Sequence, residues 1–207
     1  MSRPVIVFAT RNQGKLREVS AALGEAAQVR SLSDYPPVPE PAEDGDDFAE
    51  IALGKALAYA GLLALHLEEG ALVLAEDAGL EVFSLDGYPG VRSSRIADAD
   101  DVKMALVLAK LRAKGYADED SRAARFVSAM ALVRGTETLA QAEGDVHGVV
   151  ALEPRGEGGF GYDPVFFYPP YGKTFGECTA AEKRAVSHRT MALTAILDYV
   201  RTNLMED

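Results

Sequence analysis

The chain has 207 residues, and its 32 acidic residues outnumber its 21 lysines and arginines, which gives a formal net charge of −11. A chain of this length forms one domain of ordinary size or two lobes that share a core. The acidic balance argues against a protein that binds nucleic acid polymers, because neutralising a phosphate backbone needs a basic face. It leaves open a small anionic ligand held by a few local cations.

Other features of the composition narrow the class further. The single cysteine, Cys178, cannot form an intrachain disulfide, which argues against a secreted disulfide scaffold. No Cys and His spacing is typical of a zinc site. The first apolar run, residues 5–9, is shorter than the core of a signal peptide, and no run reaches the roughly 18 residues of a membrane span. We therefore expect a globular cytoplasmic protein with no membrane partner.

The first half of the chain alternates strand and helix signals. Residues 31–47 carry four prolines among acidic residues, which predicts a rigid surface loop rather than a helix or a central strand. Around this loop the apolar segments are either β-branched and short or alanine-rich and long. The elements predicted here are a strand at 4–9, an amphipathic helix at 16–23, a long helix at 48–65, and strands at 71–77 and 80–85.

The second half contains neighbouring strand signals as well. Residues 97–115 have acids early and basic residues late, which the dipole of a helix favours. Alternating helices and strands with some adjacent strands predict an α/β domain with a mixed sheet. The elements predicted here are a helix at 97–115, paired strands at 123–133 and 136–152, a glycine loop at 155–164, a short strand at 165–168 and a C-terminal helix at 181–204.

A polar loop with a glycine and a lysine joins the first predicted strand to the first helix. Backbone N–H groups at the start of a helix attract anions, Gly14 permits close approach, and Lys15 adds a positive charge. The loop lacks the Walker A pattern, so the residues alone fit either a phosphate site or an ordinary helix start. It comprises Thr10, Arg11, Asn12, Gln13, Gly14 and Lys15.

Two adjacent acids, Glu76 and Asp77, follow an apolar strand. The carboxyl ends of strands are where α/β sheets place their sites, and neighbouring residues of a strand point to opposite faces. These two carboxylates are therefore expected to have different roles unless the strand has already ended. Carboxylate oxygens suit Mg²⁺, and further acids near Glu43 could approach in space. The alternative is an acidic turn that leads into Ala78.

The glycine loop contains two aromatic residues, Phe160 and Tyr162. Glycine lets a flat ligand approach, so either ring could stack on a purine base, or both could pack into the core. Further along, Lys183, His188 and Arg189 form part of a run that is typical of a phosphate or base-edge reader. Because Ser187 and Arg189 are two residues apart, they cannot share one helical face, so either part of this run is irregular or some of its members have no functional role.

Four segments together resemble the inosine triphosphate pyrophosphatase family: FATRNQGKLREV, AEDAGLEVFSLDGYPGVRSSRIA, GEGGFGYDPVFF and GKTFGECTAAEKRAVSHRTMAL. The resemblance implies one elongated, mixed α/β domain over residues 1–207, with two lobes and a central substrate cleft, assembled as a homodimer. It implies Mg²⁺-dependent hydrolysis of inosine, deoxyinosine and xanthosine triphosphates to the monophosphate and pyrophosphate. The biological role would be the removal of deaminated purines from the nucleotide pool.

The resemblance also implies roles for individual residues. Asp77 would bind the metal and accept a proton from the attacking water, although its unperturbed pKa of about 3.9 makes it a poor free base. His188 and Arg189 would read the 6-oxo edge of the base. The implied metal ligands are Glu43, Glu76 and Asp77, and the implied catalytic residues are Asp77 and Lys15. The other implied substrate contacts are Thr10, Arg11, Asn12, Gln13, Gly14, Ala78, Phe160, Gly161, Tyr162, Asp163 and Lys183.

The chain departs from the family pattern at several of these positions. Glu76 stands where the family has aspartate, Ala78 replaces a serine, Ile51 replaces an asparagine, and Arg92 replaces a tyrosine. Two alternatives therefore stay open: a pyrophosphatase for other modified nucleotides, including pyrimidines, and a nucleotide-binding protein with weakened catalysis. The intact run from Ser187 to Arg189 favours purines, and Asp77 favours retained catalysis.

Overall fold

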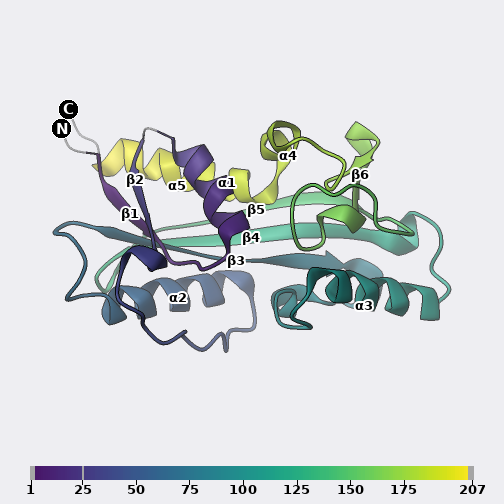
Figure 1. Cartoon of the computed structure of the whole chain (residues 1–207), viewed down its shortest axis with the longest axis horizontal. Coiled ribbons are helices and arrows are strands. Elements are labelled where there is room, and N and C mark those ends of the chain that lie inside the picture. Colours follow the sequence, from purple (N-terminus) through teal and green to yellow (C-terminus); the bar gives the residue numbers. More distant parts are fainter. Residues whose placement is uncertain (1–2, 25, 205–207) are drawn as a thin grey trace. The chain divides into compact units, whose positions relative to one another are not determined.

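The structure, a computed structural model, describes residues 3–24 and 26–204 (Figure 1). Its helices alternate with strands along the chain, as the sequence predicts. The α-helices are α1 (Gln13–Leu23), α2 (Phe48–Leu62), α3 (Asp100–Ala113), α4 (Ala180–Val186) and α5 (His188–Leu204). The strands are β1 (Val5–Phe8), β2 (Gln28–Ser31), β3 (Leu72–Val82), β4 (Ala123–Arg134), β5 (Glu137–Val150), β6 (Phe166–Tyr168) and β7 (Lys173–Thr174). Within the described part of the chain, no helix is long and apolar enough to cross a membrane.

The strands form one mixed sheet in the order β2-β1-β3-β4-β5-β6-β7. β1 pairs in parallel with β2 and with β3, whereas β6 pairs antiparallel with β5 and with β7. This arrangement confirms the predicted α/β class with a mixed sheet. The edge strand β2 was not predicted, because its sequence QVRS is short and mostly polar.

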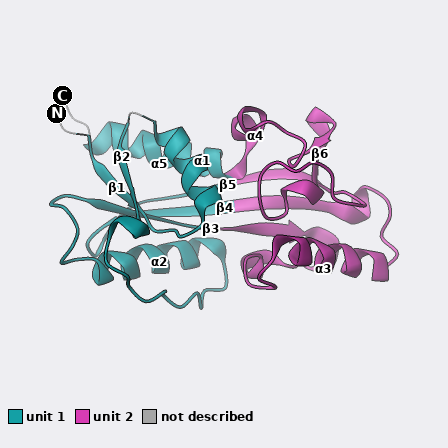
Figure 2. Cartoon of the chain, viewed as in Figure 1, with its two compact units in different colours: residues 1–77, 128–144, 189–207 teal, residues 78–127, 145–188 magenta. Residues whose placement is uncertain are grey.

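The chain divides into two compact units (Figure 2). Unit 1 comprises residues 1–77, 128–144 and 189–207, and unit 2 comprises residues 78–127 and 145–188. In unit 1, helices α1 and α5 lie on one face of the strands and α2 lies on the other (Figure 1). Each unit has its own apolar core: residues of α1, α5, β1 and β3 pack in unit 1, and residues of α3, β4 and β6 pack in unit 2. The predicted single domain with a central cleft stays a prediction.

One prediction for the middle of the chain was wrong. The segments 71–77 and 80–85 were predicted as two strands, but β3 is one strand of 11 residues that includes Glu76 and Asp77. The strand can continue because residue 79 is glycine. A Cβ at Gly79 would lie 2.5 Å from the carbonyl oxygen of Gly90 and from Ser93 Oγ, so a side chain there would collide with the neighbouring segment.

The C-terminal helix also differs from its prediction as one helix over 181–204. It is two helices, and Ser187 between them has extended backbone angles of φ −76° and ψ 145°. The irregular backbone, one of the two alternatives from the spacing of Ser187 and Arg189, is therefore confirmed. The boundary between the two units falls just after this break, so His188 belongs to unit 2 and Arg189 to unit 1.

Candidate functional site

The polar loop after β1 is organised by the side chain of Asn12, which caps α1. Asn12 Oδ1 accepts hydrogen bonds from the backbone N–H groups of Gly14 and Lys15, at 2.8 and 3.1 Å. Thr10 Oγ1 accepts from the backbone N–H of Asn12 at 3.1 Å. The backbone N–H groups of Gly14 and Lys15, which we considered as a possible anion site, are thus hydrogen-bonded to Asn12 in this structure. Arg11, which is exposed, donates to the carbonyl of Val38 at 2.9 Å.

The side chain of Lys15 leaves this loop toward the buried carboxylate of Glu76. Lys15 Nζ lies 3.4 Å from Glu76 Oε2. Glu76 Oε1 accepts hydrogen bonds from Ser128 Oγ at 2.7 Å and from Arg189 Nε at 2.8 Å. Burial lowers the pKa of Lys15, against the attraction of Glu76. Glu76 thus faces two cations and a hydroxyl, all of unit 1.

Arg189 is buried, with 3% of its surface exposed, at the start of α5. Its Nη1 contacts Glu18 Oε2 of α1 while its Nε contacts Glu76. Although burial alone would lower the pKa of Arg189, the two carboxylates outweigh it and raise that pKa. Within the described structure, Arg189 is therefore bound to carboxylates, and its predicted role toward the base edge stays a prediction.

Asp77 is only 4% exposed and has different surroundings from its neighbour Glu76. Lys55 of α2 lies between two of the predicted metal ligands: its Nζ is 2.7 Å from Glu43 Oε1 and 3.4 Å from Asp77 Oδ1. In the described part of the chain, Asp77 Oδ2 is buried and has no hydrogen-bond partner. The expectation that Glu76 and Asp77 point to opposite faces of the strand agrees with their separate partners.

These surroundings change the acidity of both partners. Burial raises the pKa of Asp77 to about 6, although Lys55 and Lys15 oppose the shift. Burial would lower the pKa of Lys55, but Asp77 and Glu43 outweigh it and raise that pKa. A carboxylate with a pKa near 6 is a better proton acceptor than an ordinary aspartate, because its basicity is closer to that needed at neutral pH.

Asp77 and Glu43 fit a divalent metal in their donor chemistry. Among residues 3–24 and 26–204, no group of three or more His, Cys, Asp or Glu side chains is arranged to hold a metal ion. Mg²⁺, however, usually keeps several waters and needs only one or two carboxylates. The buried Oδ2 of Asp77 and the Glu43 carboxylate supply two, and both acids contact the Lys55 ammonium. The residues present therefore fit a hydrated divalent cation.

In unit 2, the glycine loop is built around Asp163, which is 2% exposed. Asp163 Oδ2 accepts from Lys183 Nζ at 2.7 Å and from the backbone N–H of Phe160 at 2.8 Å. Residue 159 must be glycine, because its φ is +74° and a Cβ would lie 2.0 Å from Asp163 Oδ2. Lys183 Nζ lies 4.6 Å from the centre of the half-buried Phe160 ring. The loop therefore presents one ring and one cation together.

The two aromatic residues of the loop have different environments. Tyr162 is buried, and its hydroxyl donates to the carbonyl of Ser93 at 2.8 Å, so Tyr162 packs into the core. Gly161 donates from its backbone N–H to Asp100 Oδ2 at 2.7 Å. His188 is 4% exposed and stacks on Phe126, with ring centres 4.9 Å apart and planes 17° apart. Because Tyr162 is buried and Phe160 is only half-buried, Phe160 is the ring of this loop that could stack on a base.

The structure thus brings the predicted residues together in two groups, one in each unit. Sequence reasoning missed Lys55, Glu18 and Ser128, which are the partners of the predicted acids and of Arg189. One signal was available for Lys55, because it is the only charged residue between positions 51 and 65. A buried helix of alanine and leucine rarely keeps a lysine unless that lysine has a partner.

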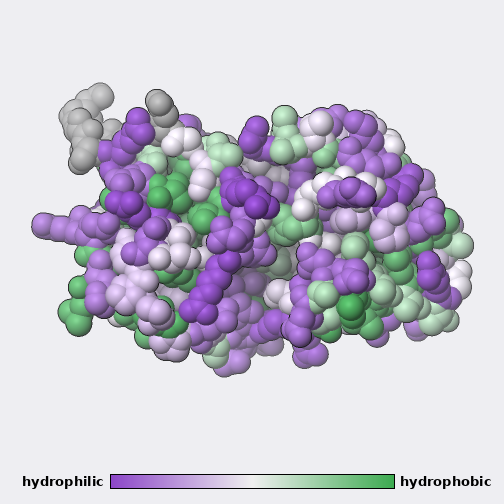
Figure 3. All heavy atoms as spheres, in the orientation of Figure 1, coloured by the Kyte–Doolittle hydropathy of each residue, from purple (hydrophilic) through white to green (hydrophobic). Residues whose placement is uncertain are grey.

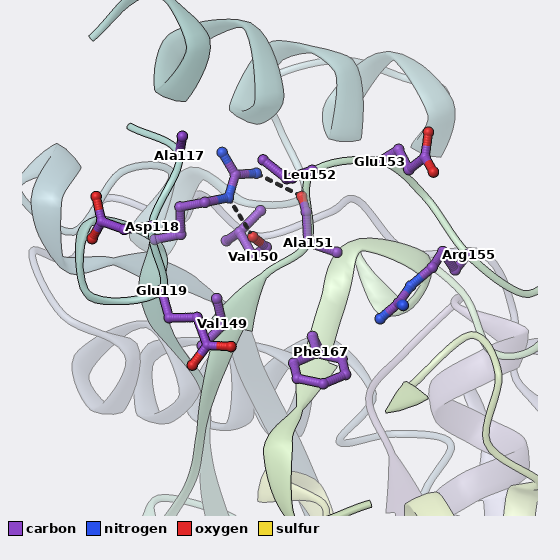
Figure 4. A pocket seen from close by; sticks show the side chains of 11 residues that line it. Ala117, Asp118, Glu119, Val149, Val150, Ala151, Leu152, Glu153, Arg155 and Phe167 are labelled. Carbon is purple, nitrogen blue, oxygen red and sulfur yellow. Dashed lines mark hydrogen bonds between the residues drawn. The ribbon is translucent and has the colours of Figure 1, made fainter. Parts of the chain in front are cut away.

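A separate pocket of about 400 Å³ lies in unit 2 and contains none of the predicted residues (Figure 4). One of its lining residues is the buried Arg122, whose Nε donates to the carbonyl of Val150 and whose Nη2 donates to the carbonyl of Ala151, both at 2.6 Å. Its Nη1 donates to the carbonyl of Tyr116 at 3.0 Å. The guanidinium therefore ties β5 to the segment before β4, and we assign this pocket no part in the site.

Comparison with known proteins gives consistent matches over nearly the whole chain. A model of the Ham1 family matches residues 6–199. A dITP/XTP pyrophosphatase of Syntrophobacter fumaroxidans is 43% identical over 194 residues, which is 93% of this chain and 80% of that protein. One of Geobacillus kaustophilus is 42% identical over 192 residues, which is 92% of this chain and 91% of that protein.

Solved structures agree with these matches. A HAM1 protein from Coxiella burnetii has a TM-score of 0.82 and 33% identity, and the alignment covers 96% of this chain and 99% of that one. A dITP/XTP pyrophosphatase from Mycobacterium abscessus has a TM-score of 0.71 and 38% identity, with 93% and 98% covered.

Proposed function

This chain belongs to the Ham1 family, and we propose that it hydrolyses non-standard purine nucleoside triphosphates to the nucleoside monophosphate and pyrophosphate. Its substrates are deoxyinosine, inosine and xanthosine triphosphates, and the enzyme removes deaminated purines from the nucleotide pool. The observation that carries this proposal is the buried Asp77. One of its carboxylate oxygens has no hydrogen-bond partner in the described chain, its pKa is raised, and the charges of Lys55 and Lys15 act on it.

The charged residues of unit 1 act on the phosphates and on water. Lys15 and Lys55 neutralise phosphate oxygens, and the hydroxyl of Thr10 donates to them. Asp77 accepts the proton of the attacking water at Oδ2, which no other described group occupies. Asp77 and Glu43 would hold a divalent metal, which would neutralise phosphate charge and make water more acidic. Without the metal and the phosphates, Lys55 holds the two carboxylates together.

The residues of unit 2 act on the base. Phe160 stacks on the purine, and Asp163 holds Lys183 beside that ring. His188 supplies a donor for the 6-oxo group, and stacking on Phe126 fixes the plane of its ring. A site built on such donors rejects the 6-amino group of adenine, because the wrong partner leaves a buried donor unpaired.

A panel of substrates tests this proposal. The purified protein is incubated with Mg²⁺ and inosine, xanthosine, adenosine or guanosine triphosphate, or with a modified pyrimidine triphosphate, and the release of pyrophosphate is measured. We expect inosine and xanthosine triphosphates to be hydrolysed at least about a hundredfold faster than adenosine triphosphate, measured as kcat/KM. Equal rates on all five would contradict the 6-oxo selectivity, and a preference for the pyrimidine would favour the alternative substrate class.

We also propose Mg²⁺ as the metal and a homodimer as the assembly. The pairing of Asp77 with Glu43 supports a hard cation that keeps its own waters. Exposed apolar residues of α3, among them Val102 and Leu106, support a self-association surface, and Figure 3 shows hydrophobic side chains over this helix. Replacing Mg²⁺ by Ca²⁺ or removing it with a chelator should stop turnover, and sedimentation should give twice the chain mass of 22.1 kDa. The cytoplasmic location stays a prediction.

A further inference from the structure

We propose that Asp100, the first residue of α3, is a positioning residue: it binds the backbone of Gly161 and thereby fixes the direction of the Phe160 ring. This inference rests on the proposed function, in which that ring stacks on the purine, and it names a further residue on which binding of the base depends. Neither the motifs of the sequence nor the family resemblance pointed to Asp100.

The first support is the pair of contacts on the two oxygens of Asp100. Its Oδ2 accepts from the backbone N–H of Gly161 at 2.7 Å, and the two residues are 61 positions apart in the chain. Its Oδ1 accepts from Lys103 Nζ at 3.0 Å, one turn further along α3. A hydrogen bond to a charged carboxylate is stronger than one to a neutral acceptor, and the ammonium on the other oxygen restricts the orientation of the carboxylate. Asp100 therefore connects the first turn of α3 to the glycine loop.

The second support is the place of this contact relative to Phe160. A peptide unit is planar, so the direction of a side chain depends on the two peptide planes that flank its Cα. The N–H of Phe160 belongs to the plane before it and donates to Asp163 Oδ2 at 2.8 Å. The N–H of Gly161 belongs to the plane after it and donates to Asp100. Two carboxylates thus hold both planes, and with them the bond that carries the ring.

The third support is the composition of the loop. Four of the six residues 156–161 are glycine, which loses more backbone freedom on ordering than any other residue. Beyond them, Tyr162 is buried and its hydroxyl donates to the carbonyl of Ser93 at 2.8 Å. The hydrogen bond at Gly161 therefore secures the link between the half-buried ring and the buried one, in a segment that has little stiffness of its own.

The neighbouring Asp101 separates this role from an ordinary helix start. Both acids lie in the first turn of α3, where the helix dipole favours negative charge. Asp101 is exposed, and its Oδ1 accepts from the backbone N–H of Val102 at 2.9 Å. In the described chain, Asp101 forms no hydrogen bond or ion pair with the glycine loop. The needs of the helix therefore account for Asp101, but not for the bond from Asp100 to Gly161.

The expected consequence is confined to the base. Without the carboxylate of Asp100, the Phe160 ring has more orientations in the free protein, and a bound nucleotide has to order it at a cost in affinity. The phosphates are assigned to Lys15 and Lys55 of unit 1, which have other partners. A ligand that lacks the base should therefore not depend on Asp100.

Calorimetry with the two products of the proposed reaction tests this difference. In the presence of Mg²⁺, Asp100→Ala should raise the Kd of inosine monophosphate by about tenfold and change that of inorganic pyrophosphate by less than about twofold. The matched control is Asp101→Ala, which removes the same charge from the same helical turn and should leave both values within about twofold. An equal loss of inosine monophosphate binding in Asp101→Ala, or an equal loss of pyrophosphate binding in Asp100→Ala, would overturn the proposal.

Kinetics test whether Asp100 acts through the ring. Asp100→Ala should raise KM for inosine triphosphate by about tenfold and leave kcat within about twofold, and Asp100→Asn, which keeps an acceptor oxygen without its charge, should give an intermediate KM. Adding Asp100→Ala to Phe160→Ala should cost far less than tenfold, because a positioning residue loses its effect once its target is gone. Purely additive costs in the two backgrounds, or an unchanged KM in Asp100→Ala, would contradict the proposal.

Hydrogen exchange of the Gly161 amide, followed by NMR, tests the anchoring itself without any nucleotide. Loss of the hydrogen bond in Asp100→Ala should accelerate this exchange by at least about tenfold, while Asp101→Ala should leave it unchanged. This measurement needs no turnover, so it remains decisive if the wild-type protein hydrolyses none of the triphosphates and the proposed function fails. An exchange rate that is the same in Asp100→Ala and in the wild type would overturn the inference, whatever the protein hydrolyses.

Discussion

Glu76 and Asp77 are consecutive residues of one strand, both buried, and yet the structure gives them opposite surroundings. Glu76 lies beside the charged groups of Arg189 and Lys15 and the hydroxyl of Ser128, whereas Asp77 shares the ammonium of Lys55 with Glu43. The difference shows that burial alone does not assign a role to a carboxylate.

The largest effect is expected at Asp77 itself. Asp77→Asn keeps the size of the side chain but removes its charge and its capacity to accept a proton, so kcat should fall by about a thousandfold or more. Binding of inosine monophosphate, followed by calorimetry, should stay within about threefold, because Lys15 and the glycine loop are unchanged. The exposed Asp198, changed to Asn, serves as the control. Retained turnover in Asp77→Asn would remove this residue from its assigned role.

The next effect concerns Lys55, whose ammonium contacts both Asp77 and Glu43. Lys55→Met leaves two largely buried carboxylates without their ammonium, so the free energy of unfolding at pH 8 without metal should fall by about 3 kcal/mol. Saturating Mg²⁺ should restore most of this loss, because the metal takes the place of the missing charge. Chemical denaturation measures both values.

The matched control for that prediction is Lys103→Met. Lys103 pairs with Asp100 three residues earlier on α3, near the surface, and its loss should cost less than about 1 kcal/mol. A loss at Lys55 as small as the loss at Lys103 would show that Asp77 and Glu43 do not depend on their shared cation.

A pH dependence of stability tests the raised pKa of Asp77. Because the folded pKa of Asp77 is raised to about 6, the folded state holds a proton that the unfolded state has already lost between about pH 4 and pH 6. The contribution of Asp77 to the free energy of unfolding therefore decreases as the pH rises through this window. Without metal, the wild-type protein should lose about 2–3 kcal/mol relative to Asp77→Asn between pH 4 and pH 8. A difference between the two proteins that does not change with pH would contradict the raised pKa.

The smallest effect is expected on the side of Glu76. Ser128→Ala removes one buried hydrogen bond to Glu76 Oε1 and leaves both cations in place, so the free energy of unfolding should fall by about 1.5 kcal/mol. The value of kcat should stay within about threefold, since Arg189 and Lys15 keep their carboxylate. Thr194→Ala, on the exposed face of α5, is the control. If Ser128→Ala lowered kcat as strongly as Glu76→Gln, the hydroxyl rather than the cations would be the partner that matters.

Local patterns in the sequence were enough to predict most of the helices and strands and the two loops that carry site residues. The first strand, the long helices and the glycine loop were predicted because their signals are contiguous. β3 was wrongly divided, because acids and a glycine in the middle of a strand are typical of a turn. Here the tight approach of residues 90–93 to Gly79 keeps the chain extended.

The partners of the site residues could not be predicted in the same way. Lys55 and Asp77 are 22 residues apart, Ser128 and Glu76 are 52 apart, and Arg189 and Glu76 are 113 apart. No local periodicity relates residues at such separations; only the pairing of strands and the packing of helices bring them together. For the same reason, the positive partners of Glu76 are visible only in the fold: the sequence predicted different roles for the two adjacent acids, and only the family resemblance implied that both bind the metal.

The proposed reaction can be tested most directly by ³¹P NMR of inosine triphosphate during incubation with the protein and Mg²⁺. Cleavage between the α- and β-phosphates predicts that the triphosphate signals are replaced by those of inosine monophosphate and pyrophosphate alone, with no signal of a diphosphate or of free phosphate at early times. Inosine diphosphate and orthophosphate as the first products would contradict the account.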